Sequence, residues 1–107
     1  IILKLPPALA PIKAAIFPLI KDKELVKIGQ KLYQELQPNL SVFYDQTGSI
    51  GRRYRRQDEI GTPYGITIDF ESKKDKKATI RDRDTMKQER IPIKEIEEWL
   101  TENLASS

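Results

Sequence analysis

The order of apolar segments along the chain constrains its fold more than any other feature. An apolar run over Lys13–Ile20 is followed by a helical stripe and then by a second apolar run over Leu40–Asp45. A third run, Tyr64–Phe70, comes after a second helical segment. A strand, a helix and a strand in succession form a crossover whose two strands run parallel. Two such crossovers in a row predict that the first three strands are parallel.

Two helices are predicted between these strands. Asp22 can cap the first helix, and Pro38 ends it. Its apolar residues recur every three or four positions, as expected for one buried face. These residues are Leu25, Ile28, Leu32 and Leu36, with Val26 and Tyr33 beside them. The second helix follows Ser49 and ends at Gly61.

The last third of the chain predicts a hairpin and a final helix. Ala78–Asp82 is a fourth strand, joined to the third by a lysine-rich tip over Ser72–Lys77. Gln88–Ile91 is a short fifth strand, and Pro92 begins the last helix. Since a hairpin pairs its strands antiparallel, the sequence predicts an α/β fold with a mixed, layered sheet.

The length of 107 residues predicts one folded domain. Residues 1–11, which are interrupted by prolines, are expected to be a linker or docking segment, and residues 12–107 the domain itself. The opening residues do not resemble a signal peptide, and no apolar run of about 18 residues predicts a membrane span. The chain does not begin with methionine, so we interpret it as a piece of a longer protein.

The chain contains no cysteine and no histidine. It therefore has no thiol nucleophile, no disulfide, and neither of the two side chains most often used for neutral-pH catalysis and transition-metal binding. The net charge of +3 favours a polyanionic partner, although this balance is common among unrelated domains. We expect a binding domain rather than an enzyme, with no cofactor and no metal of its own.

A cluster of arginines opens the predicted second helix. Four arginines lie within five positions around one tyrosine, Tyr54; they are Arg52, Arg53, Arg55 and Arg56. At 100° per residue, Tyr54 lies opposite to Arg52, Arg55 and Arg56, so three guanidinium groups share a solvent face. Guanidinium groups in such a cluster bind phosphates, and they are typical of single-stranded RNA recognition.

Further candidate residues follow the third and fourth strands. Phe70 can stack on an unpaired base, and Glu71 can accept a hydrogen bond from a base edge. Arg81 and Arg83 belong to the string RDRD, where carboxylates can fix a guanidinium for bidentate contacts. The alternatives are a core phenylalanine, a solvated glutamate and a structural ion-pair network. The two aspartates of RDRD lack a third ligand, so we expect no magnesium site there.

These candidates are expected to share one place on the sheet. Ligands of open α/β sheets bind at the carboxyl ends of the parallel strands. We therefore expect Arg52, Phe70 and Arg83 to lie together where the central strands end, and to contact one oligonucleotide.

Three strings carry a resemblance to a known family: LAPIKAAIFPL, YDQTGSIGRRYRRQDEIGTPYGITIDF and ATIRDRDTMKQERIPI, which together span roughly Leu9–Ile93. By these strings the chain resembles the C-terminal anticodon-binding domain of class II aminoacyl-tRNA synthetases, and among them that of glycyl-tRNA synthetase. The resemblance implies a three-layer α/β fold, with three parallel strands and an antiparallel hairpin in a five-stranded sheet flanked by three helices.

The resemblance also implies a function. The partner would be the anticodon loop of glycine tRNA, and the parent a cytoplasmic homodimer that attaches glycine using ATP and magnesium. The fragment itself, which can be a monomer, would not be catalytic. In similar domains the first arginine of GRRY, the phenylalanine of TIDF and the second arginine of RDRD lie at the anticodon; here these are Arg52, Phe70 and Arg83. The charge of the tip over Lys73–Lys77 varies in such domains, so no role is assigned to its lysines.

A second hypothesis is an interaction module with the same fold outside the synthetases, such as a polymerase accessory subunit or a regulatory paralogue. Such a module need not keep GRRY and RDRD together. Because both strings are present here, the anticodon-binding hypothesis is favoured. A small independent enzyme is disfavoured by the missing histidine and cysteine.

Overall fold

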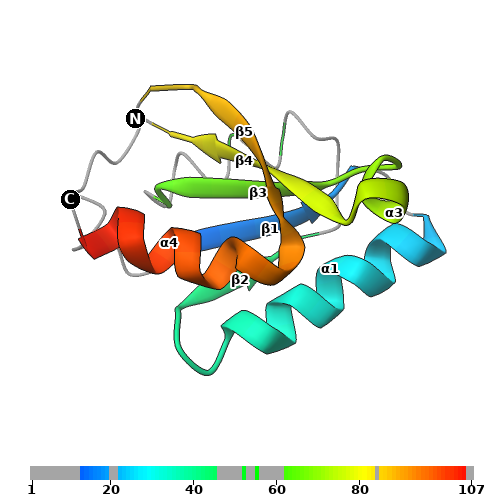
Figure 1. The fold of residues 1–107 in the computed structure, drawn as a ribbon, viewed down its shortest axis with the longest axis horizontal. Coiled ribbons are helices and arrows are strands. Elements are labelled where there is room, and N and C mark those ends of the chain that lie inside the picture. The colour runs from blue at the N-terminus through cyan, green and yellow to red at the C-terminus, as the bar shows by residue number, and fades with distance from the viewer. Residues whose placement is uncertain are drawn as a thin grey trace.

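The computed structural model of the chain describes residues 13–19, 22–45, 52, 55, 62–83 and 85–105. Figure 1 shows the arrangement of the elements. The strands are β1 (Ala14–Pro18), β2 (Val42–Tyr44), β3 (Tyr64–Ile68), β4 (Lys77–Asp82) and β5 (Gln88–Pro92). The helices are α1 (Lys23–Leu36), α3 (Ser72–Asp75) and α4 (Ile96–Ala105), and a short 3-10 helix, η2 (Ile93–Glu95), precedes α4.

The five strands form one mixed sheet in the order β2-β1-β3-β4-β5. β1 lies between β2 and β3 and is parallel to both. β4 pairs antiparallel with β3 on one side and with β5 on the other. The predicted mixed sheet, with three parallel strands and an antiparallel hairpin, is therefore confirmed.

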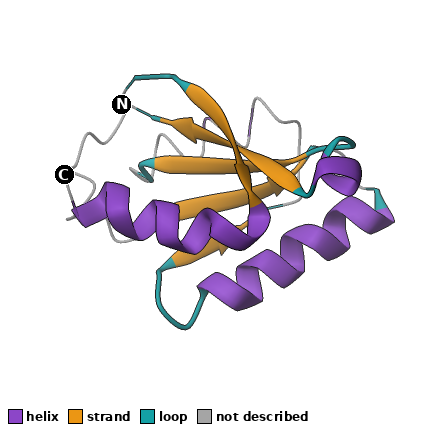
Figure 2. Cartoon of the chain, viewed as in Figure 1, coloured by secondary structure: helices purple, strands orange, loops and turns teal. Residues whose placement is uncertain are grey.

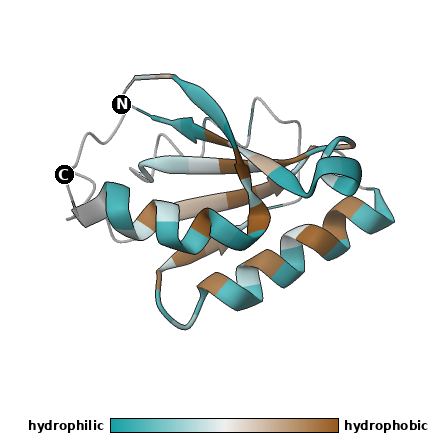
Figure 3. Ribbon diagram, viewed as in Figure 1, coloured by the Kyte–Doolittle hydropathy of each residue, from teal (hydrophilic) through white to brown (hydrophobic). Residues whose placement is uncertain are grey.

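The core lies between the sheet and the two long helices, which cover the same face of the sheet (Figure 1). At its centre Ile16, Ile66 and Ile80 are register neighbours on β1, β3 and β4. Leu32 of α1 and Leu100 of α4 pack against this row, and each of these side chains is at most 2% exposed. Burying one such side chain contributes about 1.5–3 kcal/mol. In Figure 3 the apolar residues of α1 show as brown segments that recur along the helix.

Helix α1 begins where the sequence predicts, because Asp22 caps it. The Asp22 Oδ1 atom accepts hydrogen bonds from the backbone N–H groups of Glu24 (3.0 Å) and Leu25 (3.2 Å). Gly29 lies on the buried face of α1, where an added Cβ atom would be only 3.0 Å from Cε1 of Tyr44. The missing side chain at this position lets α1 approach the end of β2 closely.

Two expectations on the elements are changed, and two more lie wholly or partly outside the described residues. The segment after β3 is not a simple hairpin tip, because Ser72–Asp75 forms the helical turn α3, which ends at Lys76 in a left-handed conformation (φ 56°) (Figure 2). β3 ends at Ile68, two residues earlier than predicted. Of the predicted second helix only Arg52 and Arg55 are described, and both are helical. The predicted linker, residues 1–11, lies outside the described residues.

Candidate nucleic-acid interface

The turn that follows β3 is fixed by reciprocal hydrogen bonds. The backbone N–H of Asp69 donates to Oγ of Ser72 (3.1 Å), and the backbone N–H of Ser72 donates to Oδ1 of Asp69 (3.1 Å). Ser72 is buried, with an exposed fraction of 1%. Because Asp69 and Ser72 bond to each other, the two residues between them are displayed outward. Phe70 is 48% exposed, and Glu71 is exposed as well.

Arg90 of β5 holds this turn from one side. Its Nη1 atom donates to Oδ2 of Asp69 (3.0 Å) and to Oγ1 of Thr79 (3.2 Å). Its Nη2 atom donates to both carboxylate oxygens of Asp75, at 2.9 and 2.8 Å. Its Nε atom is 4.0 Å from the carboxylate of Glu71, too far for a hydrogen bond. One guanidinium group therefore joins β5 to both ends of the turn.

The titration of these groups agrees with this geometry. Burial alone would lower the pKa of Arg90, but its hydrogen bonds with Asp75 and Asp69 outweigh that effect and raise the pKa. Burial would raise the pKa of Asp75, and the backbone N–H of Lys77 together with Arg90 lowers it below its usual range. Both shifts favour the charged forms of Arg90 and Asp75.

Lys73 holds the turn from the other side. Its ammonium group is 3.0 Å from Oδ1 of Asp22 and 3.5 Å from Oε2 of Glu24, at the start of α1. The same ammonium lies 5.0 Å from the centroid of the Phe70 ring, within the range of a cation–π contact. The hydrogen bond between Lys73 and Asp22 lowers the pKa of Asp22 and raises the pKa of Lys73.

Arg83 and Arg81 lie at the other end of the β3/β4 pair. The backbone N–H of Arg83 donates to the carbonyl oxygen of Pro63 (2.8 Å), just before β3 begins. Both side chains are buried, each with an exposed fraction of 7%. The Nη2 atom of Arg81 contacts Sδ of Met86 (2.9 Å), which sits in the turn between β4 and β5. These arginines are therefore built into the protein surface rather than extended from it.

The expectation that Arg52, Phe70 and Arg83 form one cluster at the carboxyl ends of the strands does not hold for Phe70 and Arg83. They flank opposite ends of β3, because β4 runs antiparallel to it. At about 3.3 Å per residue, the seven residues from Pro63 to Phe70 place the two sites about 20 Å apart. In Figure 1, α3 lies at the right end of the sheet and β4 ends at the left.

The remaining predicted residues are placed only in part. Arg52 and Arg55 are exposed and lie three positions apart on a helix, which puts them on one side of it. Arg53 and Arg56 lie outside the described residues. Two residues of the site were missed by the sequence analysis, Lys73 and Arg90. The available signal was the alternation of charge in DFESKKD, whose acidic residues need cationic partners.

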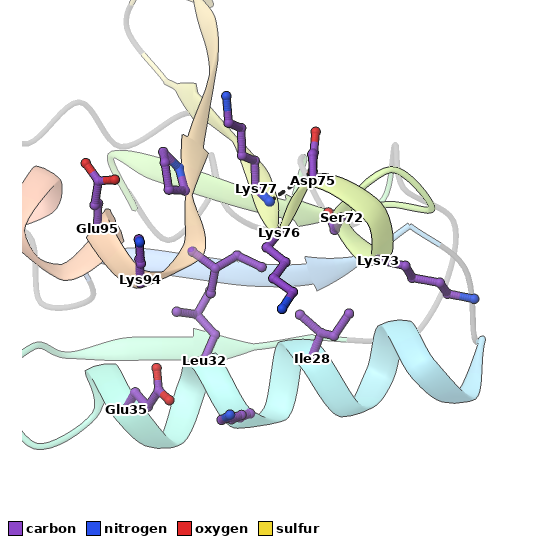
Figure 4. A pocket seen from close by; sticks show the side chains of 13 residues that line it. Ile28, Leu32, Glu35, Ser72, Lys73, Asp75, Lys76, Lys77, Lys94 and Glu95 are labelled. Carbon is purple, nitrogen blue, oxygen red and sulfur yellow. Dashed lines mark hydrogen bonds between the residues drawn. The ribbon is translucent and has the colours of Figure 1, made fainter.

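A separate surface, lined by lysines and by the acidic residues Glu35, Asp75 and Glu95, lies beside α3. A groove of about 700 Å³ runs between α1, α3 and η2, lined by Ile28 and Leu32 and by several lysines. Figure 4 shows Lys76 pointing toward Ile28, whereas Lys73 extends away from the groove. The lysines that line the groove are Lys31 of α1, Lys73 of α3, Lys76 just after α3, Lys77 of β4 and Lys94 of η2. Phe70 and Glu71 do not line this groove, whereas Lys73 belongs to both surfaces, so Ile28 and Lys76 are the residues that report on the groove by itself.

The described residues offer neither a metal site nor a membrane span. No group of three or more acidic side chains there could hold a metal ion. None of the helices described combines the length and the apolar composition that a membrane span needs.

The fold and the sequence both place the chain among known domains. A family model described as "Anticodon binding domain" matches residues 13–103. The structure resembles prolyl-tRNA synthetase from Cryptosporidium parvum, with a TM-score of 0.89 and 24% identity over 97% of this chain and 23% of that one. It also resembles the RNA binding domain of threonyl-tRNA synthetase from Cryptosporidium parvum Iowa II, with a TM-score of 0.82 and 24% identity over 92% of this chain and 25% of that one. The chain belongs to the anticodon binding domain family.

Within this family, the curated relatives point to one kind of synthetase. The chain is 55% identical over 104 residues to the glycine–tRNA ligase of Geobacillus kaustophilus, covering 97% of this chain and 22% of that protein. It is 54% identical over 95 residues to the glycine–tRNA ligase of Rhodopirellula baltica, covering 89% of this chain and 18% of that protein. The resemblance inferred from the sequence is confirmed. The chain spans about a fifth of the length of these relatives.

Proposed function

We propose that the chain is the anticodon-reading domain of a glycine–tRNA ligase and binds the anticodon loop of glycine tRNA. The observation that carries this proposal is the 55% identity to a glycine–tRNA ligase over nearly the whole chain. In this proposal the rest of the polypeptide attaches glycine to the tRNA with ATP and magnesium, and the parent enzyme is a cytoplasmic homodimer. The chain itself contributes binding and no catalytic residue.

The chemistry at the α3 turn supports base recognition. Glycine codons begin with GG, so the anticodon of glycine tRNA carries two cytosines. Cytosine offers an N4 amino donor together with acceptors at N3 and O2. In the proposal one base stacks on Phe70, and the neighbouring carboxylate of Glu71 accepts a hydrogen bond from a cytosine N4 group. Both side chains are exposed on a turn that Arg90 and Lys73 hold in place.

The arginines complete the proposed interface. In the proposal, Arg83 and Arg81 mark a second contact region at the far end of β3, where both are largely buried. The cluster of Arg52, Arg53, Arg55 and Arg56 attracts the phosphates. Each phosphate contact is weak on its own and is screened by salt. The alternative of a polymerase accessory subunit or regulatory paralogue is not favoured, because the relatives described above are ligases.

A panel of anticodon stem-loops tests this proposal. The 107-residue chain is titrated with the glycine stem-loop and with variants in which each anticodon base is replaced in turn, by fluorescence anisotropy at fixed salt. We expect weak binding, in the micromolar range. Replacing either cytosine should weaken it by about 1–3 kcal/mol, or about 5- to 150-fold, while replacing the wobble base should have little effect. Equal affinity for all variants would reject base recognition, since the RNAs carry the same charge.

A further inference from the structure

Lys73 contacts the exposed ring of Phe70 in the α3 turn. Its ammonium lies 5.0 Å from the centroid of the Phe70 ring, over one face of that ring. An ammonium over a ring face prevents a base from stacking on that face. One face of Phe70 is therefore occupied from within the protein, and since the residue is 48% exposed, a base that stacks on it would use the opposite face.

The position of the ammonium is set by α1. The Oδ1 atom of Asp22 accepts hydrogen bonds from two backbone N–H groups of α1 and lies 3.0 Å from Nζ of Lys73. Glu24 adds a second carboxylate at 3.5 Å. Because α1 is packed against the core through residues such as Leu25, which is fully buried, this anchor is rigid. Asp22, Lys73 and Phe70 thus form a chain of contacts from the helix to the exposed ring.

From these contacts we propose that Lys73 is a positioning residue: anchored by Asp22, it holds the Phe70 ring so that the opposite face of the ring stacks on one base of the bound RNA. The proposal rests on the proposed function. Because Asp22 and Glu24 neutralise the ammonium, Lys73 acts through the geometry of the ring and adds little long-range attraction for RNA. An exposed cation–π contact of this kind corresponds to about a two- to fivefold change in affinity.

The Asp22→Asn variant separates geometry from charge. Asparagine caps a helix as well as aspartate does, so α1 should keep its start. The variant raises the net charge by one, and general attraction for RNA therefore predicts tighter binding. Loss of the anchor for Lys73 predicts the opposite, a weakening of about two- to fivefold for the glycine stem-loop. The matched control is Glu35→Gln, which makes the same charge change on α1 away from Phe70, and should bind as tightly as the wild type or slightly more tightly.

A double-mutant cycle tests whether Lys73 acts through Phe70. Lys73→Met should weaken binding of the glycine stem-loop. Lys73→Arg should retain the affinity, because a guanidinium can also lie over the ring. In a Phe70→Leu background, Lys73→Met should have no further effect. Circular dichroism checks that each variant folds. The proposal is overturned if Lys73→Met lowers the affinity as much in the Phe70→Leu background as in the wild type, or if Asp22→Asn binds the stem-loop more tightly than the wild type. Wild-type chain that does not distinguish anticodon bases would instead reject the proposed function.

Discussion

At the scale of single residues, hydrogen bonding separates the side chains that hold the α3 turn from those that can meet a ligand. Asp69 and Asp75 are bound by Arg90, and Ser72 is buried. Phe70 and Glu71, between them, point to solvent. An exposed aromatic ring on a turn fixed from two sides does not have to be ordered when a base stacks on it. Its contribution to binding is therefore not reduced by the entropy of ordering the turn.

We expect Phe70→Leu to weaken binding of the glycine stem-loop by about 1–3 kcal/mol, because leucine cannot stack on a base. The matched control is Phe43→Leu, which changes the other exposed phenylalanine, 38% exposed on the edge strand β2. Its affinity should equal that of the wild type. Anisotropy titrations measure both variants, and equal losses in the two would show that the effect is not local to the α3 turn.

A second prediction concerns pH. Since the folded-state pKa of Asp22 is below its usual value, chiefly through Lys73, ionised Asp22 stabilises the fold at pH values above the unfolded-state pKa, near 4. This stabilisation is lost as the pH falls through the folded-state pKa. The wild type should therefore be more stable than Asp22→Asn at pH 7, with the difference vanishing once the pH lies below the folded-state pKa of Asp22. Urea unfolding at several pH values measures this difference, and a gap that stays constant into acid would contradict it.

At the scale of elements, the sequence predicted the order of the strands and of the long helices because their periodicities are clear. It could not show α3, because the four-residue helix over SKKD has no apolar stripe. The turn is stabilised instead by Asp69, a near neighbour, and by Arg90, which is distant in the sequence. The separation of Phe70 from Arg83 follows directly from the antiparallel hairpin that the sequence did predict. In an antiparallel pair the second strand ends beside the start of the first, so the end of β4 lies beside the start of β3.

Arg90 is expected to determine the stability of the α3 turn. Arg90→Met should lower the free energy of unfolding by about 1–2 kcal/mol, because Asp69 loses its charged partner while partly buried. Arg90→Lys should restore little of this loss, since one ammonium cannot reproduce the bidentate contact with Asp75. In both variants the amide hydrogens of Ser72–Asp75 should exchange faster. Full stability of the lysine variant would show that charge alone suffices.

At the scale of the whole molecule, α1 and α4 share one core with the sheet, so the two sites at the ends of β3 are held at a fixed spacing. Leu32→Ala should lower the free energy of unfolding by about 2–5 kcal/mol in a single cooperative transition. The control Lys31→Ala changes an exposed neighbour on the same helix and should have an effect within about 0.5 kcal/mol. Urea denaturation followed by circular dichroism measures both, and two separate transitions would contradict a shared core.

The most direct test of the account is to map the RNA contact on the protein by NMR. The isotope-labelled chain is titrated with the glycine anticodon stem-loop, and amide shifts are followed along the described residues. We expect the largest changes at Phe70 and Glu71 and at Arg81–Arg83, about 20 Å away at the other end of β3, with only small changes at Ile28 and Lys76 in the groove. Shifts confined to the groove, or to one end of β3, would contradict an RNA interface that includes both Phe70 and Arg81–Arg83.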